Sequence, residues 1–340
     1  MSQRLLFITP KIKENDDDFS FCALWARAFE RAGFDVVVIC LEKGNHTLTM
    51  PVYSLGREKN WSRLRSFLYF QWLILTIPHD RVFVHMNPRW LAAGAWLWFV
   101  KQTPTYLWYT HYTRTFSMKI GDKIVKRLFA ATKESLPQYE GDPRKIILGH
   151  GIDTDFWDFD LNEFEDRKPK NNLLAVHRIS RSKRIDLVIK ALKFLPKEYT
   201  LTHFGRALDP TRDPDYEKEI RSLAADPDLA GRVTFMGSRP MPELKKIYPK
   251  YSMLVNLVPG TIDKTVLEAM YCGVTPVITR AHADAIGYPD APVSDEPEDI
   301  AKYILEKTPD KTAELRQIVT DRHDLNGLIK KMSEYIKQGD

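Results

Sequence analysis

The sequence predicts an α/β protein made of two doubly wound domains of similar size, and three observations point to this fold class. A length of 340 residues favours two domains. Short apolar runs alternate with helical segments in both halves, which is typical of parallel βαβ units. A charged stretch without hydrophobic periodicity, residues 156–172, separates the halves. We therefore expect an N-terminal domain of residues 1–160, a C-terminal domain of residues 161–322 and a final helix at residues 323–340.

The first half contains six apolar runs with the length and composition of buried strands. They are residues 5–9, 35–41, 81–86, 105–109, 129–132 and 145–148. Residues 19–32 have the apolar spacing of a helix, and Gly33 follows as a C-terminal cap. Residues 90–100 are expected to form a second helix.

The alternation restarts after residue 172. The expected strands are residues 173–176, 200–204, 232–236, 253–257 and 275–279, and the expected helices are residues 185–194, 215–225, 242–247 and 264–272. Pro242 suits the first turn of its helix. Residues 296–337 are expected to be helical throughout.

Composition excludes several classes of protein. Apolar residues make up 44% and charged residues 28%, as in ordinary globular chains. A net charge of +5 suits phosphate-bearing ligands or an anionic membrane surface and does not require nucleic acid. No apolar run reaches the roughly 20 residues of a transmembrane helix, and no signal peptide is evident. The cysteines, Cys22, Cys40 and Cys272, form no close pair in the sequence, so we expect a reducing, cytoplasmic environment.

Residues 57–78 combine basic and aromatic side chains. They include Arg57, Lys59, Trp61, Arg63, Arg65, Phe67, Phe70 and Trp72. This combination is typical of an amphipathic helix that lies on an anionic membrane. The alternative is a core helix of the N-terminal domain with a basic start.

A basic cluster stands where a predicted strand of the second half gives way to a helix. It consists of Arg178, Arg181, Lys183 and Arg184. Ligands of open α/β sheets bind beyond the carboxyl ends of strands, and a helix N-terminus with added cations favours anions. The cluster therefore predicts a diphosphate site, with a solvated basic helix start as the alternative.

A second strand-to-helix turn lies at residues 258–268. The amides of Thr261 and Ile262 are placed to hold a phosphate. Glu268, on the following helix, would accept hydrogen bonds from a ribose diol. The alternative is that Glu268 is an exposed helix residue.

Several other motifs are missing from the sequence. No Gly-x-Gly-x-x-Gly follows the first strand, and no Gly-Lys-Ser/Thr phosphate loop or Gly-x-Ser-x-Gly elbow occurs. Asp-x-Asp triplets begin at residues 16, 153, 158, 213 and 226. None ends a predicted strand, so we interpret them as turns and caps rather than as a metal site.

Four segments, in their order and spacing, resemble the large family of retaining GT-B glycosyltransferases, the group 1 or family-four type. They are His-Gly-Ile-Asp at 150–153, Arg-Ile-x-x-x-Lys at 178–183, Arg-Val-Thr-Phe-Met-Gly at 232–237 and Leu-Glu-Ala-Met-x-x-Gly-x-x-Pro-Val at 267–277. The resemblance implies two Rossmann-like domains that face each other across a cleft, with the final helix crossing back to the N-terminal domain. It also implies transfer of a sugar from a nucleotide sugar to a hydroxyl of a glycan or lipid-linked acceptor, with retention at the anomeric carbon. No metal or other cofactor would be required, because basic side chains would stabilise the diphosphate.

The resemblance also implies roles for particular residues. Arg178 and Lys183 would bind the diphosphate, and His111 would lie near the sugar, so these three are the expected catalytic residues. Glu268 would hold the ribose. Further donor contacts are expected from Gly237, Gly260, Thr261, Ile262, Asp263 and Lys264. Candidates for the acceptor side are Lys11, His85, Asn87 and His150.

The chain departs from the family pattern in three places. The family usually has two glutamates eight positions apart, and the first position is Gly260 here, which leaves Asp263 and Lys264 to replace the sugar contact. The glycine pair after the first strand is absent, and His177 occupies the glycine position before the donor arginine. A sugar-nucleotide epimerase of the same fold and a non-catalytic nucleotide-sugar-binding protein therefore remain alternatives. The lipid-linked acceptors common in the family favour a peripheral location on the inner face of a membrane.

Overall fold

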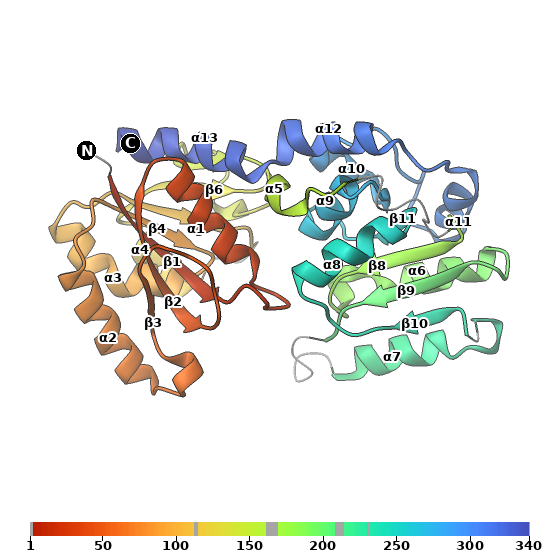
Figure 1. The fold of residues 1–340 in the computed structure, drawn as a ribbon, viewed down its shortest axis with the longest axis horizontal. Coiled ribbons are helices and arrows are strands. Elements are labelled where there is room, and N and C mark those ends of the chain that lie inside the picture. The colour runs from red at the N-terminus through yellow and green to blue at the C-terminus, as the bar shows by residue number, and fades with distance from the viewer. Residues whose placement is uncertain (1–2, 112–114, 161–168, 208–213, 230, 340) are drawn as a thin grey trace. The chain divides into compact units, whose positions relative to one another are not determined.

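The computed structural model describes residues 3–111, 115–160, 169–207, 214–229 and 231–339, and it divides into two compact units. The first unit contains residues 1–151 and 325–340, and the second contains residues 152–324. Each unit has its own parallel sheet with helices on its faces (Figure 1). This arrangement confirms the predicted α/β class with two Rossmann-like domains.

The first unit is built on a seven-stranded sheet in the order β3-β2-β1-β4-β5-β6-β7. The strands are β1 (Arg4–Ile12), β2 (Asp35–Lys43), β3 (Val52–Ser54), β4 (Arg81–His85), β5 (Thr105–Trp108), β6 (Val125–Ala130) and β7 (Lys145–Ile147), and all neighbours pair in parallel. The helices are α1 (Phe21–Arg31), α2 (Arg63–Thr76), α3 (Pro88–Val100), α4 (Phe116–Gly121) and α13 (Leu325–Gln338).

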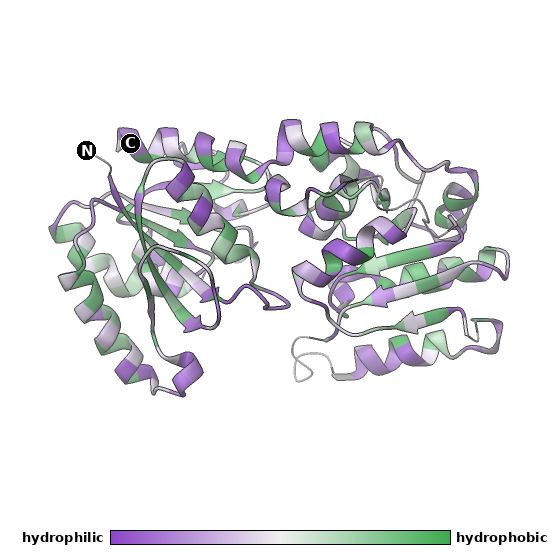
Figure 2. Ribbon diagram, in the orientation of Figure 1, coloured by the Kyte–Doolittle hydropathy of each residue, from purple (hydrophilic) through white to green (hydrophobic). Residues whose placement is uncertain are grey.

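Side chains that alternate along the strands separate the two faces of this sheet. Leu6 and Ile8 of β1 point to one face and join a core with Phe70 of α2 and Trp98 of α3. Phe7 of β1 points to the other face, where its ring lies 5.8 Å from that of Phe29 in α1. In Figure 2 the strands are the most uniformly apolar elements, as expected for a parallel sheet that is covered on both faces.

The last helix, α13, packs on α1 and belongs to the first unit. Its buried side chains include Leu328, Ile329 and Met332. The carbonyl of Ile336 accepts a hydrogen bond from Arg81 Nε at 3.0 Å. The C-terminal helix is thus tied both to a helix and to the start of a central strand of this unit.

The second unit has a five-stranded parallel sheet in the order β10-β9-β8-β11-β12. The strands are β8 (Asn172–Val176), β9 (Thr200–Phe204), β10 (Val233–Phe235), β11 (Met253–Asn256) and β12 (Thr275–Ile278). The helices are α5 (Thr154–Trp157), α6 (Ile185–Ala191), α7 (Pro214–Ala224), α8 (Met241–Ile247), α9 (Lys264–Tyr271), α10 (Arg280–Ile286), α11 (Pro297–Glu306) and α12 (Thr312–His323). The strand order reverses between β8 and β11, so this sheet has a topological switch point there.

Several expected boundaries differ from the structure. Residue 160 lies inside the second unit, because Asp153 caps α5 and the ring of Trp157 packs 5.6 Å from that of Tyr248. β1 extends to Ile12, since Lys11 is in register with Glu42 and forms an ion pair with it at 3.0 Å.

The helices and strands that the sequence analysis missed are short. They are β3, α4, α5 and α10. The sixth strand begins at Val125, four residues before the predicted start at residue 129. The prediction began too late because Lys126 and Arg127 are polar. The region 296–337 is divided into α11, α12 and α13 by Pro309 and Asp324 rather than being one continuous run. None of the helices in the described part of the chain is both long enough and apolar enough to cross a membrane.

Candidate functional site

The candidate site lies at the carboxyl edge of the second sheet, around the switch point between β8 and β11. In open α/β sheets the loops that follow such neighbouring strands diverge and leave room for a ligand. The loop after β8 carries Arg178 and Lys183, and the loop after β11 carries residues 258–263. The fold thus brings together the two segments that the sequence analysis singled out separately.

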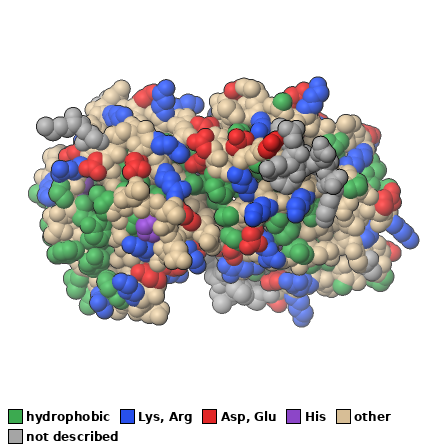
Figure 3. Space-filling model, in the orientation of Figure 1, with side chains coloured by type: hydrophobic (Ala, Val, Ile, Leu, Met, Phe, Trp, Pro, Cys, Tyr) green, Lys and Arg blue, Asp and Glu red, His purple; other side chains and the backbone are tan. Residues whose placement is uncertain are grey.

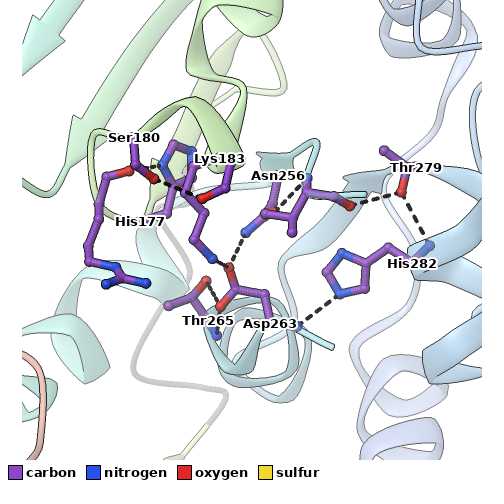
Figure 4. A network of polar contacts seen from close by, with 11 residues as sticks. His177, Ser180, Lys183, Asn256, Asp263, Thr265, Thr279 and His282 are labelled. Atoms are coloured by element: carbon purple, nitrogen blue, oxygen red, sulfur yellow. Dashed lines mark hydrogen bonds and ion pairs between the residues drawn. The ribbon is translucent and has the colours of Figure 1, made fainter. Parts of the chain in front are cut away.

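Lys183 and Asp263 join these two loops directly (Figure 4). Lys183 Nζ donates to Asp263 Oδ2 at 2.5 Å, and both side chains are largely buried, with 15% and 11% of their surface exposed. Burial raises the pKa of the Asp263 carboxyl, but the nearby ammonium and the hydrogen bonds from Lys183 and Asn256 outweigh this effect and hold the pKa well below its usual value. The carboxyl of Asp263 is therefore ionised at neutral pH.

The structure divides the basic cluster into two pairs of residues with different surroundings. Arg181 binds Glu219 at 2.9 Å, and Arg184 binds Asp295 at 2.6 Å, so both are engaged by acidic side chains of the second unit. Arg178 is exposed, and its guanidinium has no hydrogen bond or ion pair within the described residues. Arg178 is thus the member of the cluster without an acidic partner in the described residues, whereas Lys183, although paired with Asp263, keeps two N–H donors next to the loop after β11.

The loop after β11 offers backbone donors beside this pair. Gly260 has φ +60°, a left-handed conformation, and a Cβ there would meet open space. The amides of Gly260, Thr261 and Ile262 have no hydrogen-bond partner in the described part of the chain. Successive free amides next to two cations form a favourable setting for a phosphate.

Glu268 lies in the middle of α9 and is buried, so the alternative of an exposed helix glutamate is wrong. Tyr248, at the end of α8, donates its hydroxyl to Glu268 Oε2 at 3.2 Å. Burial raises the pKa of Glu268 to about 7, although the charge of Lys264 and the hydrogen bond from Tyr248 act in the opposite direction.

Three buried histidines surround the carboxyl edge of this sheet, and the sequence analysis did not assign them to the site. They are His177, His203 and His282. Burial lowers the pKa of each, to about 4 for His177 and His282 and about 3 for His203. His177 Nε2, both ring nitrogens of His203 and His282 Nδ1 are buried without a hydrogen-bond partner in the described residues. Because single histidines inside apolar runs carry no distinctive sequence signal, this group is visible only in the structure.

Glycines allow the strand ends to approach closely here. Gly205 follows β9 at φ +152°, and a Cβ on it would lie 1.9 Å from the carbonyl oxygen of His177. Gly237 follows β10 at φ +71°, and its carbonyl accepts the amide of Gly205 at 3.1 Å. Gly237 therefore supports the loop after β9 through its backbone.

The residues expected on the acceptor side, together with His111, lie in the last residues of strands of the first unit or after those strands. His111 is exposed after β5, with its ring 5.2 Å from that of Tyr109, and its neighbour Tyr112 lies outside the described residues. His150 follows β7, and its ring lies 5.6 Å from that of Trp108. Asn87 is half-buried and precedes α3.

Two of these acceptor-side candidates are engaged within the protein. Lys11 binds Asp16 at 2.8 Å and Glu42 at 3.0 Å. His85 is 1% exposed, and its ring packs 4.6 Å from that of Trp25. Their surroundings favour structural roles, whereas those of His111, Asn87 and His150 leave them accessible.

Three of the Asp-x-Asp triplets form turns and caps, and in the triplet at residues 158–160 Asp158 binds Arg316 at 3.2 Å. Asp16 accepts the amides of Asp18 and Phe19, Asp153 accepts the amide of Phe156, and Asp226 accepts the amide of Asp228. The triplet that begins at residue 213 lies partly outside the described residues. Within the described ranges, no three side chains of the metal-binding types converge.

The two strand orders and the site at the switch point define a protein of the GT-B class, with two Rossmann-like domains. Residues 158–288 match the model of the family described as Glycosyl transferases group 1. None of the curated protein sequences is detectably similar to the chain.

Solved structures of glycosyltransferases share the fold along nearly the whole chain. HepE from Anabaena, in complex with UDP-glucose, has a TM-score of 0.76 at 16% identity and covers 99% of this chain and 100% of its own. Sucrose-phosphate synthase from Thermosynechococcus elongatus has a TM-score of 0.73 at 16% identity, with coverages of 99% and 98%. WaaG, a glycosyltransferase involved in lipopolysaccharide biosynthesis, has a TM-score of 0.65 at 16% identity, with coverages of 98% and 99%.

Proposed function

We propose that the protein is a retaining glycosyltransferase that moves a sugar from a nucleotide sugar to a hydroxyl of a glycan or lipid-linked acceptor. The observation that carries the proposal is the bond between Lys183 and Asp263, which joins the loop that carries Arg178 to the loop with the free amides of residues 260–262 at the switch point of the second sheet. The group 1 family match at residues 158–288 and the UDP-glucose complex of HepE, a protein of the same fold, support it.

In the proposed reaction, Arg178 and Lys183 bind the diphosphate and stabilise the negative charge that grows on it as the bond to the sugar breaks. The acceptor hydroxyl attacks from the same face, and the departing phosphate oxygen takes its proton. The protein then contributes positioning and charge stabilisation, without a side-chain nucleophile. Two cations beside the diphosphate would perform the electrostatic task without a divalent metal.

For the donor, we propose that Glu268 accepts the ribose hydroxyls and that the Gly260–Ile262 turn meets the phosphates. Glu268 comes from the helix that follows this turn, and its carboxylate already accepts one hydroxyl, that of Tyr248. His111 is the candidate on the first unit for the sugar itself, since it is exposed after β5.

A screen of nucleotides tests the proposal. Thermal unfolding of the full chain is measured with UDP, GDP, ADP and TDP and with their sugar conjugates, since a ligand that binds the native state raises the melting temperature. Release of the nucleoside diphosphate from the best donor is then followed with glycan and lipid acceptors. Acceptor-dependent release with a new glycosidic product supports the proposal. Acceptor-independent isomerisation would indicate the epimerase, and binding without turnover across the acceptor panel would indicate a non-catalytic binding protein.

We also propose that the first unit docks on the anionic inner face of a membrane through one surface of α2 and α3, here called the α2–α3 surface. Large apolar side chains on it are exposed: Leu64, Phe67, Leu68, Trp72, Leu75, Trp96, Phe99 and Val100. Trp96 Nε1 donates to Gln71 Oε1 at 2.7 Å, which joins the two helices into one continuous surface. In Figure 3 hydrophobic side chains gather on the left of the molecule, where Figure 1 shows α2 and α3.

The charges on this surface favour lipid rather than a protein partner. Neither helix contains an acidic residue, and exposed Arg57, Lys59, Arg63 and Arg65 precede or begin α2. Exposed tryptophans next to basic side chains match the interface of an anionic bilayer.

Sedimentation with vesicles checks the docking surface. Binding to vesicles that contain phosphatidylglycerol, but weakly to pure phosphatidylcholine, is expected for the natural protein. Trp72→Glu combined with Trp96→Glu should abolish it, whereas Phe194→Glu, at an exposed aromatic residue of the second unit, should not. If the natural protein forms a dimer in solution, and the double variant loses the dimer but still binds vesicles, the surface would be assigned to a second copy of the chain.

A further inference from the structure

We propose that Asp263 is a positioning residue that orients Lys183 toward the diphosphate of the donor and does not contact the sugar. The inference rests on the proposed function, because it assigns a task within that same site. It replaces the expectation from sequence that Asp263 takes over the contact of the missing first glutamate at Gly260.

The carboxylate of Asp263 is fully engaged by the protein (Figure 4). Oδ1 accepts the backbone amide and the hydroxyl of Thr265 at 3.3 and 3.2 Å. Oδ2 accepts Asn256 Nδ2 at 3.0 Å and Lys183 Nζ at 2.5 Å. A sugar hydroxyl would have to displace one of these donors, and the exchange would leave a buried donor unsatisfied.

Asp263 is also held through its backbone. Its amide donates to His282 Nε2 at 3.2 Å, and His282 is fully buried in α10. The amide of His282 donates in turn to Thr279 Oγ1 at 3.2 Å. Asn256, the last residue of β11, is fully buried as well. The carboxylate is therefore fixed by the ends of β11 and β12, which are rigid parts of the sheet.

Lys183, in contrast, stands on a short and irregular segment. It ends a single 3-10 turn, Arg181–Lys183, and Arg184 follows at φ +51°, in the left-handed region. Within the described part of the chain, its ammonium forms its one ion pair with Asp263, so two of its three N–H donors remain for a ligand. A lysine side chain loses rotamer freedom when it is held against a ligand, and the ion pair with Asp263 already restricts the side chain of Lys183 before the donor binds.

Asp263 favours binding of the diphosphate by orienting Lys183, but its negative charge weakens binding of the donor in the ground state. It lies next to the ammonium that is expected to meet the phosphates, so it repels a bound diphosphate. Positioning mainly favours the transition state, where charge on the diphosphate is largest and geometry matters most. Removal of the carboxylate should therefore affect the turnover rate and the affinity differently.

The experiment uses the full chain and the donor identified by the screen above. Asp263→Asn keeps the size and removes the charge. We expect kcat for nucleoside diphosphate release to fall about 10- to 100-fold, since a small misplacement of a catalytic group has effects of this size. The dissociation constant for inorganic pyrophosphate should stay within about threefold or decrease. Lys183→Ala should lower kcat and raise the dissociation constant for inorganic pyrophosphate. In the Lys183→Ala background, Asp263→Asn should change kcat less than about threefold, because the two residues act as one unit.

Two further variants control for folding. Thr265→Val removes one hydrogen bond from the other carboxylate oxygen and should lower kcat less than Asp263→Asn does, with pyrophosphate binding nearly unchanged. Asp263→Glu keeps the charge on a longer side chain and should fall between the natural protein and Asp263→Asn, with an unchanged melting temperature. If Asp263→Asn does not fold, the comparison of Asp263→Glu with Lys183→Ala decides the question.

Three outcomes would overturn one or the other proposal. Full kcat in Asp263→Asn while Lys183→Ala is impaired would refute the positioning role alone. A change in the preferred sugar with kcat preserved would place Asp263 on the sugar. A natural protein that binds neither pyrophosphate nor any nucleoside diphosphate would refute the proposed function itself.

Discussion

The hydroxyl of Tyr248 donates to the carboxylate of Glu268 at 3.2 Å, in a place where Tyr248 is fully buried and only 5% of the surface of Glu268 is exposed. Tyr248 is fully buried, and its ring packs 5.6 Å from that of Trp157. A carboxylate in such surroundings loses much of its hydration, and one phenolic donor replaces only part of it. The stability of the fold should therefore depend on the protonation of Glu268.

Because burial raises the pKa of Glu268 to about 7 from its usual 4.5, the folded state holds this proton more tightly than the unfolded state. The contribution to stability is present in full below pH 4.5 and is lost as the pH rises through about 7. The difference in unfolding free energy between the natural protein and Glu268→Gln should fall by on the order of 3 kcal/mol over this interval. Urea unfolding at a series of pH values measures it, with Glu243→Gln as an exposed control. A pH-independent difference would contradict the buried, protonated carboxyl.

Replacement of Arg178 or Lys183, the two cations proposed to bind the diphosphate, should reduce activity strongly. Arg178→Ala and Lys183→Ala each remove a charge-assisted contact that strengthens in the transition state, and a loss of about 10²-fold or more in rate is expected. Arg181→Ala is the matched control, because Arg181 comes from the same cluster but binds Glu219. Steady-state rates of nucleoside diphosphate release provide the measurement. Equal losses in all three variants would point to a general effect of positive charge rather than to specific binding of the diphosphate by Arg178 and Lys183.

Chelation of divalent metal should leave the activity intact. Lys183, together with Arg178, supplies positive charge at the place where a metal would otherwise neutralise the diphosphate. Activity in excess EDTA should equal activity with added Mg²⁺ or Mn²⁺. Loss of activity in EDTA that either ion restores would show that the cations of the chain are insufficient.

The close approach of two strand ends makes Gly205 irreplaceable. A Cβ there would lie 1.9 Å from the carbonyl oxygen of His177 at φ +152°, so Gly205→Ala must shift the backbone next to Arg178. We expect this variant to unfold or to lose several kcal/mol of stability. Gly231→Ala, at φ +77° with no atom within 4 Å of the added Cβ, should cost only about 1–2 kcal/mol. Thermal unfolding of both variants checks the contrast, and similar melting temperatures would argue against the predicted clash.

The sequence analysis predicted where Arg178, Lys183 and Glu268 lie in the fold better than it predicted the residues to which they bind. Arg178, Lys183 and Glu268 were found because parallel strands place their following loops at one edge of a sheet. The bond between Lys183 and Asp263 joins residues 80 positions apart, and local periodicity contains no information on such a contact. The burial of His203 and His282 escaped for a related reason, since a histidine in an apolar run looks the same whether it faces the core or solvent.

The elements that the sequence analysis missed were those held by tertiary contacts rather than by composition. β3 has three residues and pairs with β2 through Val52, Tyr53 and Ser54. The second and third residues of β6, Lys126 and Arg127, are polar. The guanidinium of Arg127 lies 5.9 Å from the ring of Tyr335 in α13. Arg127 thus has a neighbour from the last helix of the chain, which the local sequence does not reveal.

The chain enters and leaves the second unit at neighbouring residues. Ile152 and Asp324 form a parallel bridge, and a Cβ on Gly151 would lie 2.9 Å from the Cα of Leu325. In topological terms the second unit is an insertion into the first, placed immediately before its final helix. A gene for residues 152–324 alone would therefore encode a domain whose two ends meet, and a direct junction of Gly151 to Leu325 would close the remainder without a linker. Each unit of this protein could thus be exchanged as one continuous gene segment.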